Sequence, residues 1–102
     1  MVASASVDKT VRFWQPTIGR MVRFARLEAQ PLDIDWLPDG SRIAACCANG
    51  RVYLIDPETA EVTKEISAIE GWAYALAVHP SDGSLLVGGS SGRLKRINPQ
   101  NR

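Results

Sequence analysis

The sequence has no apolar run long enough to cross a membrane, because its apolar stretches are short and interrupted by charged residues or glycine. Its first six residues have neither the cationic segment nor the long apolar segment of a signal peptide. It also lacks an excess of one charge, since 12 Lys and Arg face 11 Asp and Glu, for a net charge of +1. Such a chain has no overall field that attracts nucleic acid or an anionic membrane. We therefore expect a cytoplasmic protein that binds no membrane, with nucleic acid disfavoured as a partner.

Residue types that many catalytic and metal sites use are scarce. The single histidine, His79, directly precedes Pro80 in a turn sequence, and no carboxylate or cysteine lies at a motif spacing from it. No Ser/His/Asp order or metal-ligand cluster is present, and the glycine-rich residues 88–92 follow an expected strand without opening a helix, as a phosphate site would require. The sequence therefore predicts a protein that is not an enzyme, with no cofactor and no metal, in which His79 serves the turn.

The two cysteines, Cys46 and Cys47, are adjacent. In a strand their side chains would point to opposite faces, so a disulfide between them would be strained and a shared metal site is disfavoured. We predict two small buried or half-buried residues in a reducing compartment, with a reactive thiol as the alternative.

A pattern repeats along the chain: an apolar run, a polar tight turn, a second apolar run, and a residue followed by proline. Its copies end at Pro16, Pro57 and Pro99, at spacings of 41 and 42 residues. A period of about 40 to 45 residues with strand-like runs is typical of propeller blades.

Apolar and polar residues alternate within these runs, which predicts strands and no helix. Leu32, Ile34 and Trp36 fall on one face of such a run, and Asn49-Gly50 is the strongest hairpin turn signal in the chain. The expected strands are residues 2–6, 10–15, 21–27, 32–36, 42–48, 51–55, 62–66, 73–78, 85–89 and 93–97. We therefore predict an all-β chain of antiparallel meanders, with three, four and three strands.

Residues 4–14 resemble the second half of a WD40 repeat, in which a strand serine, a turn aspartate and a strand tryptophan recur at this spacing. Ser4, Asp8 and Trp14 match three positions of the hydrogen-bonded tetrad that this family builds within a blade. The fourth, a loop histidine, would lie upstream of Met1. Residues 37–40 and 79–83 resemble the family's turn between its first two strands.

The second and third units depart from this pattern. Their tetrad positions hold Ala45, Asn49 and Ile55 in one unit, and Val87, Ser91 and Ile97 in the other; apolar Leu27 and Ile69 stand where the loop histidine would be. We expect these units to rely on apolar packing and turn chemistry. Arg96 stands where the other units have Phe13 and Leu54, which indicates a different environment for the last strand.

The resemblance implies an incomplete WD40-like β-propeller, with a partial blade in residues 1–29, a complete blade in 30–70 and a partial blade in 71–102. A closed propeller needs at least about four blades. Exposed blade faces and strand edges are therefore expected to be covered, either by the remaining blades of a longer chain, which we favour, or by self-association. The third alternative is a small stack of sheets with poor stability.

The turns at Asp8-Lys9 and at residues 49–51 and 91–93 are expected on one rim, beside the loops that link blades. This places Lys9, Arg51 and Arg93 in neighbouring, equivalent positions, where they would either bind an anionic partner or only solvate the rim. Trp72, with Tyr74, belongs to an inter-blade loop of the same rim. It would either anchor an interface or cap the core between blades.

From the resemblance we predict a non-catalytic scaffold module that binds an unidentified protein or peptide through these rim residues. Two alternatives stay open. One is a binder of phosphate or of a nucleic-acid backbone through the basic rim, and the other is an accessory propeller domain of a larger enzyme.

Overall fold

The computed structural model describes residues 1–15 and 17–98, so the repeat prolines Pro16 and Pro99 lie outside the described residues. The described residues form strands, turns and loops, and none of them makes a helix of the length and apolarity needed to cross a membrane. The strands are β1 (Val2–Ala5), β2 (Thr10–Gln15), β3 (Arg20–Arg26), β4 (Pro31–Trp36), β5 (Ile43–Cys47), β6 (Arg51–Asp56), β7 (Glu61–Ser67), β8 (Ala73–Val78), β9 (Leu85–Gly89) and β10 (Leu94–Ile97). The all-β prediction is confirmed.

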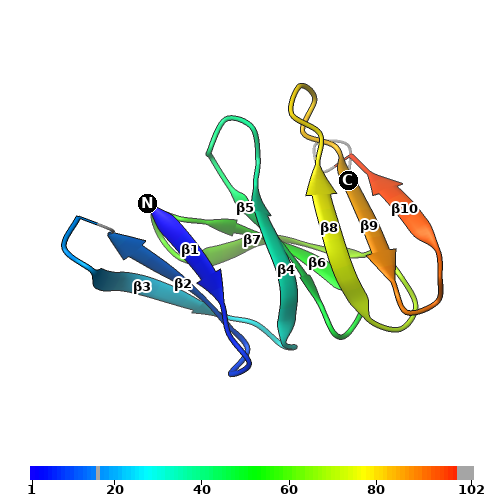
Figure 1. Cartoon of the computed structure of the whole chain (residues 1–102), viewed down its shortest axis with the longest axis horizontal. Coiled ribbons are helices and arrows are strands. Elements are labelled where there is room, and N and C mark those ends of the chain that lie inside the picture. The colour runs from blue at the N-terminus through cyan, green and yellow to red at the C-terminus, as the bar shows by residue number, and fades with distance from the viewer. Residues whose placement is uncertain (16, 99–102) are drawn as a thin grey trace.

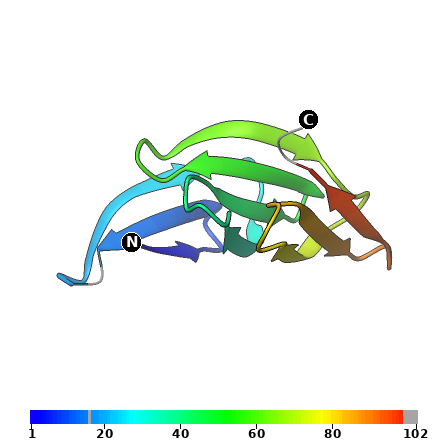
Figure 2. The ribbon, with the colours of Figure 1, turned by 90° about the horizontal axis from the view of Figure 1, so that it is seen from above.

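The strands form three antiparallel sheets in the orders β1-β2-β3, β4-β5-β6-β7 and β8-β9-β10, which we call blades 1, 2 and 3. Each strand pairs with the next along the chain, because every connection within a blade is a short turn. The sheets stand side by side in Figure 1, and Figure 2 shows blades 1 and 3 on opposite sides of blade 2.

One face of blade 2 packs against blade 1. Ile43 and Cys47 of β5 share a buried cluster with Val11 and Phe13 of β2. Trp36, at the end of β4, is partly buried against the cluster, with its ring centroid 6.4 Å from that of Phe13. Alternation along β5 and β2 therefore supplies the first core of the protein.

The other face of blade 2 packs against blade 3. Here Ala44 and Cys46 of β5 share a second buried cluster with Leu85 and Val87 of β9. All residues of β5 are buried, because its alternate side chains enter two different cores.

The adjacent cysteines divide between these cores, Cys47 in the first and Cys46 in the second, as strand alternation predicts. Both thiols are free, and burial raises the pKa of each to about 12. A thiol with such a pKa is protonated at neutral pH and is a poor nucleophile. This disfavours the reactive-thiol alternative.

Polar contacts also join the blades. The Asp33 carboxylate, on β4, accepts a hydrogen bond of 2.9 Å from the backbone N–H of Leu76, on β8. The Arg23 guanidinium, on β3, donates one of 2.9 Å to the backbone carbonyl of Pro57, in the turn after β6. Blade 2 is thus tied to both neighbours.

Each outer blade leaves one face open. Val2 and Phe24 are exposed on blade 1, and Leu86 and Leu94 are exposed on blade 3. Arg96 lies on β10 opposite Leu86, with 70% of its side chain exposed and an ion pair of 3.1 Å to Asp82. These open faces are those of an incomplete propeller, and Arg96 lies on one of them.

The first core can be tested with two phenylalanines of blade 1. Phe13 is fully buried and Phe24 is 47% exposed. We expect Phe13→Ala to lower the free energy of unfolding by about 3 to 5 kcal/mol, and Phe24→Ala by less than about 1 kcal/mol. Urea unfolding followed by circular dichroism measures both values, and similar losses in the two variants would contradict this packing.

Candidate interaction rim

The hairpin turns between β1 and β2, β5 and β6, and β9 and β10 lie beside the loops that link the blades. The backbone N–H of Leu27 donates to the carbonyl of Lys9 at 2.7 Å, that of Ile69 to Gly50 at 3.0 Å, and that of Ser90 to Trp72 at 2.9 Å. In Figure 1 these segments follow the lower edge of the molecule. We call residues 6–10, 26–31, 48–51, 67–73 and 90–93 the turn rim.

The backbone at Gly50 explains this close approach. Its φ is 78°, and a Cβ there would lie 1.9 Å from the carbonyl oxygen of Ile69. Only a glycine lets this turn approach the loop between blades 2 and 3. The Asn49-Gly50 signal in the sequence therefore fixes a contact of the rim as well as a hairpin.

The predicted equivalence of Lys9, Arg51 and Arg93 is wrong for Lys9. Lys9 has a φ of 72°, like Gly50 at 78° and Gly92 at 79°, so it occupies the turn position of these glycines. The two arginines follow that position by one residue. Equivalent positions in the three turns are those that share this backbone conformation. The prediction matched the charged residues of the turns instead, and therefore placed Lys9 one residue out of step with Arg51 and Arg93.

Arg51 is also less available than its position suggests. Its guanidinium forms an ion pair of 2.9 Å with Glu65 of β7. The Asn49 side chain accepts a hydrogen bond from the backbone N–H of Arg51 and donates one to the hydroxyl of Tyr53. The charge of Arg51 and the side-chain amide of Asn49 are therefore already paired within blade 2.

A hollow of about 630 Å³ opens in the rim between blades 2 and 3. Its lining combines two cations, one carboxylate, one hydroxyl and apolar side chains, from Ala68, Ile69, Glu70, Ser91, Arg93, Leu94 and Lys95. Within the described residues neither Arg93 nor Lys95 has an ion pair. Lys95 was missed in the sequence, although its spacing of two from Arg93 is the signal that places both on one side of a strand.

Trp72 stands next to this hollow. Its backbone N–H donates to the Ser90 hydroxyl at 3.0 Å, and its carbonyl accepts from the Ser90 N–H at 2.9 Å. Ser90 adjoins Ser91 in the wall of the hollow. The Trp72 side chain is 61% exposed and that of Tyr74 is 53% exposed, so Trp72 does not cap the core between the blades.

The rim offers binding chemistry and no metal centre, since residues 1–15 and 17–98 bring together no group of three His, Cys, Asp or Glu. His79 lies in the turn after β8, where its Nδ1 accepts a hydrogen bond from the backbone N–H of Ser81. This is the turn role expected of it.

Known proteins resemble this chain in sequence. The family model described as "WD domain, G-beta repeat" matches residues 26–56, from the end of β3 to the end of β6. Coronin-7 of Bos taurus is 34% identical over 99 residues, which is 94% of this chain and 11% of coronin-7. WD repeat-containing protein AAC3 of Dictyostelium discoideum is 33% identical over 64 residues, 63% of this chain and 13% of that protein. The chain belongs to the WD40-repeat β-propeller family.

A solved structure agrees with this assignment at the level of the fold. The β-propeller domain of Cps50 (Swd1) from Myceliophteria thermophila superposes with a TM-score of 0.85 at 19% identity, over 95% of this chain and 31% of that one. The WD40 chain therefore spans about a third of that propeller chain and little more than a tenth of coronin-7 or AAC3.

The WD40 tetrad positions of blade 1 are joined only in part. Trp14 Nε1 donates to the Ser4 hydroxyl at 3.0 Å. The Asp8 carboxylate instead accepts from the backbone N–H and hydroxyl of Thr10 and from the Arg12 guanidinium. Among the described residues Asp8 thus belongs to the turn and to β2, separate from the pair of Ser4 and Trp14.

These contacts hold the pKa of Asp8 well below its usual value. The hydrogen bond from the Thr10 hydroxyl is the largest cause, and Ser6 and Arg12 add to it, which lowers the pKa from 3.8 to about 2. A carboxylate with a depressed pKa stabilises the fold above its unfolded pKa and loses this contribution as the pH falls through its folded pKa.

We therefore expect Asp8→Asn to reduce the acid sensitivity of the protein between about pH 4 and pH 2. Urea unfolding midpoints of the wild type and the variant should converge as the pH falls through this window. Thr10→Val keeps the shape of the buried side chain but removes the hydroxyl. It should also reduce the acid sensitivity over this pH range, but by less than Asp8→Asn does. A difference between wild type and Asp8→Asn that stays constant from pH 4 to pH 2 would contradict this role of Asp8.

Proposed function

We propose that this chain is a non-catalytic scaffold module that binds another protein or a peptide at Trp72 of its turn rim, at Tyr74 on the adjoining β8, and at the hollow beside Arg93. WD40 propellers generally serve protein interaction, and the family membership gives the proposal its class. The binding site must be argued from the residues of this chain, because a fold alone does not select a partner.

The observation that carries the site is the exposure of Trp72 on a fixed backbone. Both backbone groups of Trp72 are hydrogen-bonded to Ser90, while the neighbouring Ala73 is fully buried. A large aromatic side chain that is held in place and exposed loses little conformational freedom when a partner covers it. Tyr74, two residues further on, adds a second exposed ring.

The hollow beside Trp72 indicates the chemistry of the partner. Arg93 and Lys95 favour a carboxylate or another anionic group, and Ile69 and Leu94 favour an apolar side chain next to it. We infer a peptide segment that presents an acidic residue near an apolar one. Lys9 extends the positive charge to the turn of blade 1, whereas Arg51 contributes less because Glu65 already pairs with it.

The same observations rank the two alternatives. A nucleic-acid backbone would meet the Glu70 carboxylate in the hollow and the Glu65 carboxylate that pairs with Arg51, which weakens its binding. An accessory role within a larger enzyme remains compatible with relatives much longer than this chain, and its chemistry would then lie in other sequence. We propose the cytoplasm as the compartment, since two free buried cysteines suit a reducing environment.

Peptides selected from a random library on the wild-type chain test the proposal. We expect Trp72→Ala to weaken binding of the selected peptides by about tenfold or more, because it removes the aromatic anchor. Phe24→Ala is the matched control, since it removes an exposed ring from the open face of blade 1. Fluorescence anisotropy with labelled peptides gives the affinities.

Unchanged affinities in Trp72→Ala would contradict this site. The selected peptides should contain acidic residues. Arg93→Ala should weaken their binding more than Arg51→Ala does. Binding of single-stranded DNA to the chain is measured as well. If the affinity for this DNA falls steeply with salt, and Trp72→Ala leaves the affinity for the selected peptides unchanged, the alternative of a phosphate or nucleic-acid binder replaces the scaffold proposal.

A further inference from the structure

A second hollow lies between blades 1 and 2, at the opposite ends of the strands from the turn rim. Trp36 ends β4, Gly40 lies in the turn that follows, and Pro57 and Glu58 form the turn after β6. Together with Met1 these residues line a cavity of about 400 Å³. A volume of about 300 to 1,000 Å³ is typical of ligand pockets.

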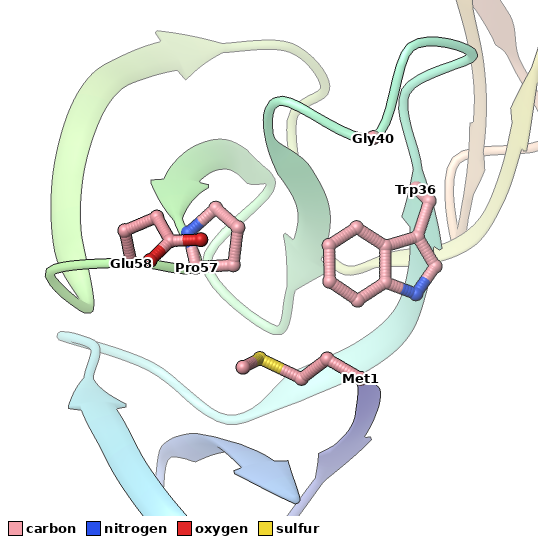
Figure 3. Close-up of a pocket in the computed structure, with 5 residues that line it drawn as sticks. All are labelled: Met1, Trp36, Gly40, Pro57 and Glu58. Carbon is pink, nitrogen blue, oxygen red and sulfur yellow. The ribbon is translucent and has the colours of Figure 1, made fainter. Parts of the chain in front are cut away.

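The Trp36 ring forms one wall of this hollow. It is partly buried against the first core, where its contact with Phe13, 6.4 Å between centroids at 58°, holds its orientation. Figure 3 shows Trp36 on one side of the hollow, Pro57 and Glu58 on the other, and the Met1 side chain between them. The lining thus pairs an oriented indole with a wall formed by Pro57 and the charged Glu58.

The side-chain charge in this hollow is negative. Glu58 is the charged side chain of the lining, is exposed, and has no ion pair within the described residues. Its backbone N–H donates to the Asp56 carboxylate at 2.8 Å, which brings a second negative charge into the same turn. The Arg23 guanidinium donates to the backbone carbonyl of Pro57 at 2.9 Å, so a carbonyl of this turn already accepts a hydrogen bond from a cationic side chain.

We propose that this hollow binds the cationic side chain of a lysine or arginine in a partner peptide. The aliphatic stem of that side chain would lie along Trp36, Pro57 and Met1, and its charged head would reach the Glu58 carboxylate. Tryptophan is the aromatic side chain that attracts cations most strongly, and the adjacent carboxylate adds to this attraction. An apolar side chain would fill the same space but leave Glu58 without a partner, and an acidic one would be repelled.

This site is separate from the turn rim and does not depend on its function. The two hollows lie at opposite ends of the strands and have opposite net side-chain charge, with Glu58 in one and Arg93, Lys95 and Glu70 in the other. A partner with both acidic and basic segments would therefore place its acidic segment at the turn rim and its basic segment at this hollow.

The three tryptophans of the chain make the test direct, because each indole N–H reports on a different place. Trp36 lines the hollow, Trp72 stands on the turn rim, and Trp14 is bonded to Ser4. The ¹⁵N-labelled full chain is titrated with capped heptapeptides of glycine and serine that carry a central arginine, lysine or norleucine. We expect the arginine and lysine peptides to shift the Trp36 indole resonance, which the Trp36→Phe variant assigns, and the norleucine peptide to leave it unchanged.

Glu58→Gln should weaken binding of the arginine peptide about threefold or more, as loss of a surface ion pair does. Glu61→Gln is the matched control, because Glu61 is exposed on β7 and lies outside the lining. Equal binding of the norleucine peptide, an equal loss in Glu61→Gln, shifts at Trp72 in place of Trp36, or no shift at all would each overturn the proposal. The Trp72 test of the turn rim uses library-selected peptides and other variants, so it can succeed or fail independently of this titration.

Discussion

The two-sided burial of blade 2 is the interaction on which the rest of the structure depends. Its central strand β5 consists of Ile43, two alanines and two cysteines, and these small side chains let a neighbouring sheet approach from each side. Blades 1 and 3 each have three strands and one packed face, and their buried apolar residues pack against blade 2. They persist because blade 2 covers them, and a polar or bulky residue in β5 would disturb two cores at once.

This packing also positions both hollows. The turn rim is fixed to the blades by backbone contacts such as that between Gly50 and Ile69, so Trp72 is exposed while Ala73 beside it enters the second core. On the other side the first core orients Trp36 through Phe13. The surfaces that we propose for binding are therefore side chains at the edges of the two cores, and their geometry follows from the way the blades pack.

The strands of this WD40 chain could be predicted because their determinants are local. Alternation with a period of two and turn sequences such as Asn49-Gly50 act within a few residues, and each strand lies within one residue of its expected ends. The pairing of Arg51 with Glu65 could not be predicted, because it depends on the register between β6 and β7, which shifts at a bulge between Leu54 and Ile55. The hollow of Trp36 and Glu58 was missed for a similar reason, since distant segments meet there only after the blades pack.

Native-state hydrogen exchange tests the central role of blade 2 most directly. If both cores depend on this blade, the slowest amides are those of β5 and β6, and they exchange only when the whole chain unfolds. The amides of β3 and β10, at the outer sides of blades 1 and 3, then exchange faster through local opening. Protection that is equal in all three blades, or highest in blade 1 or blade 3, would contradict the account.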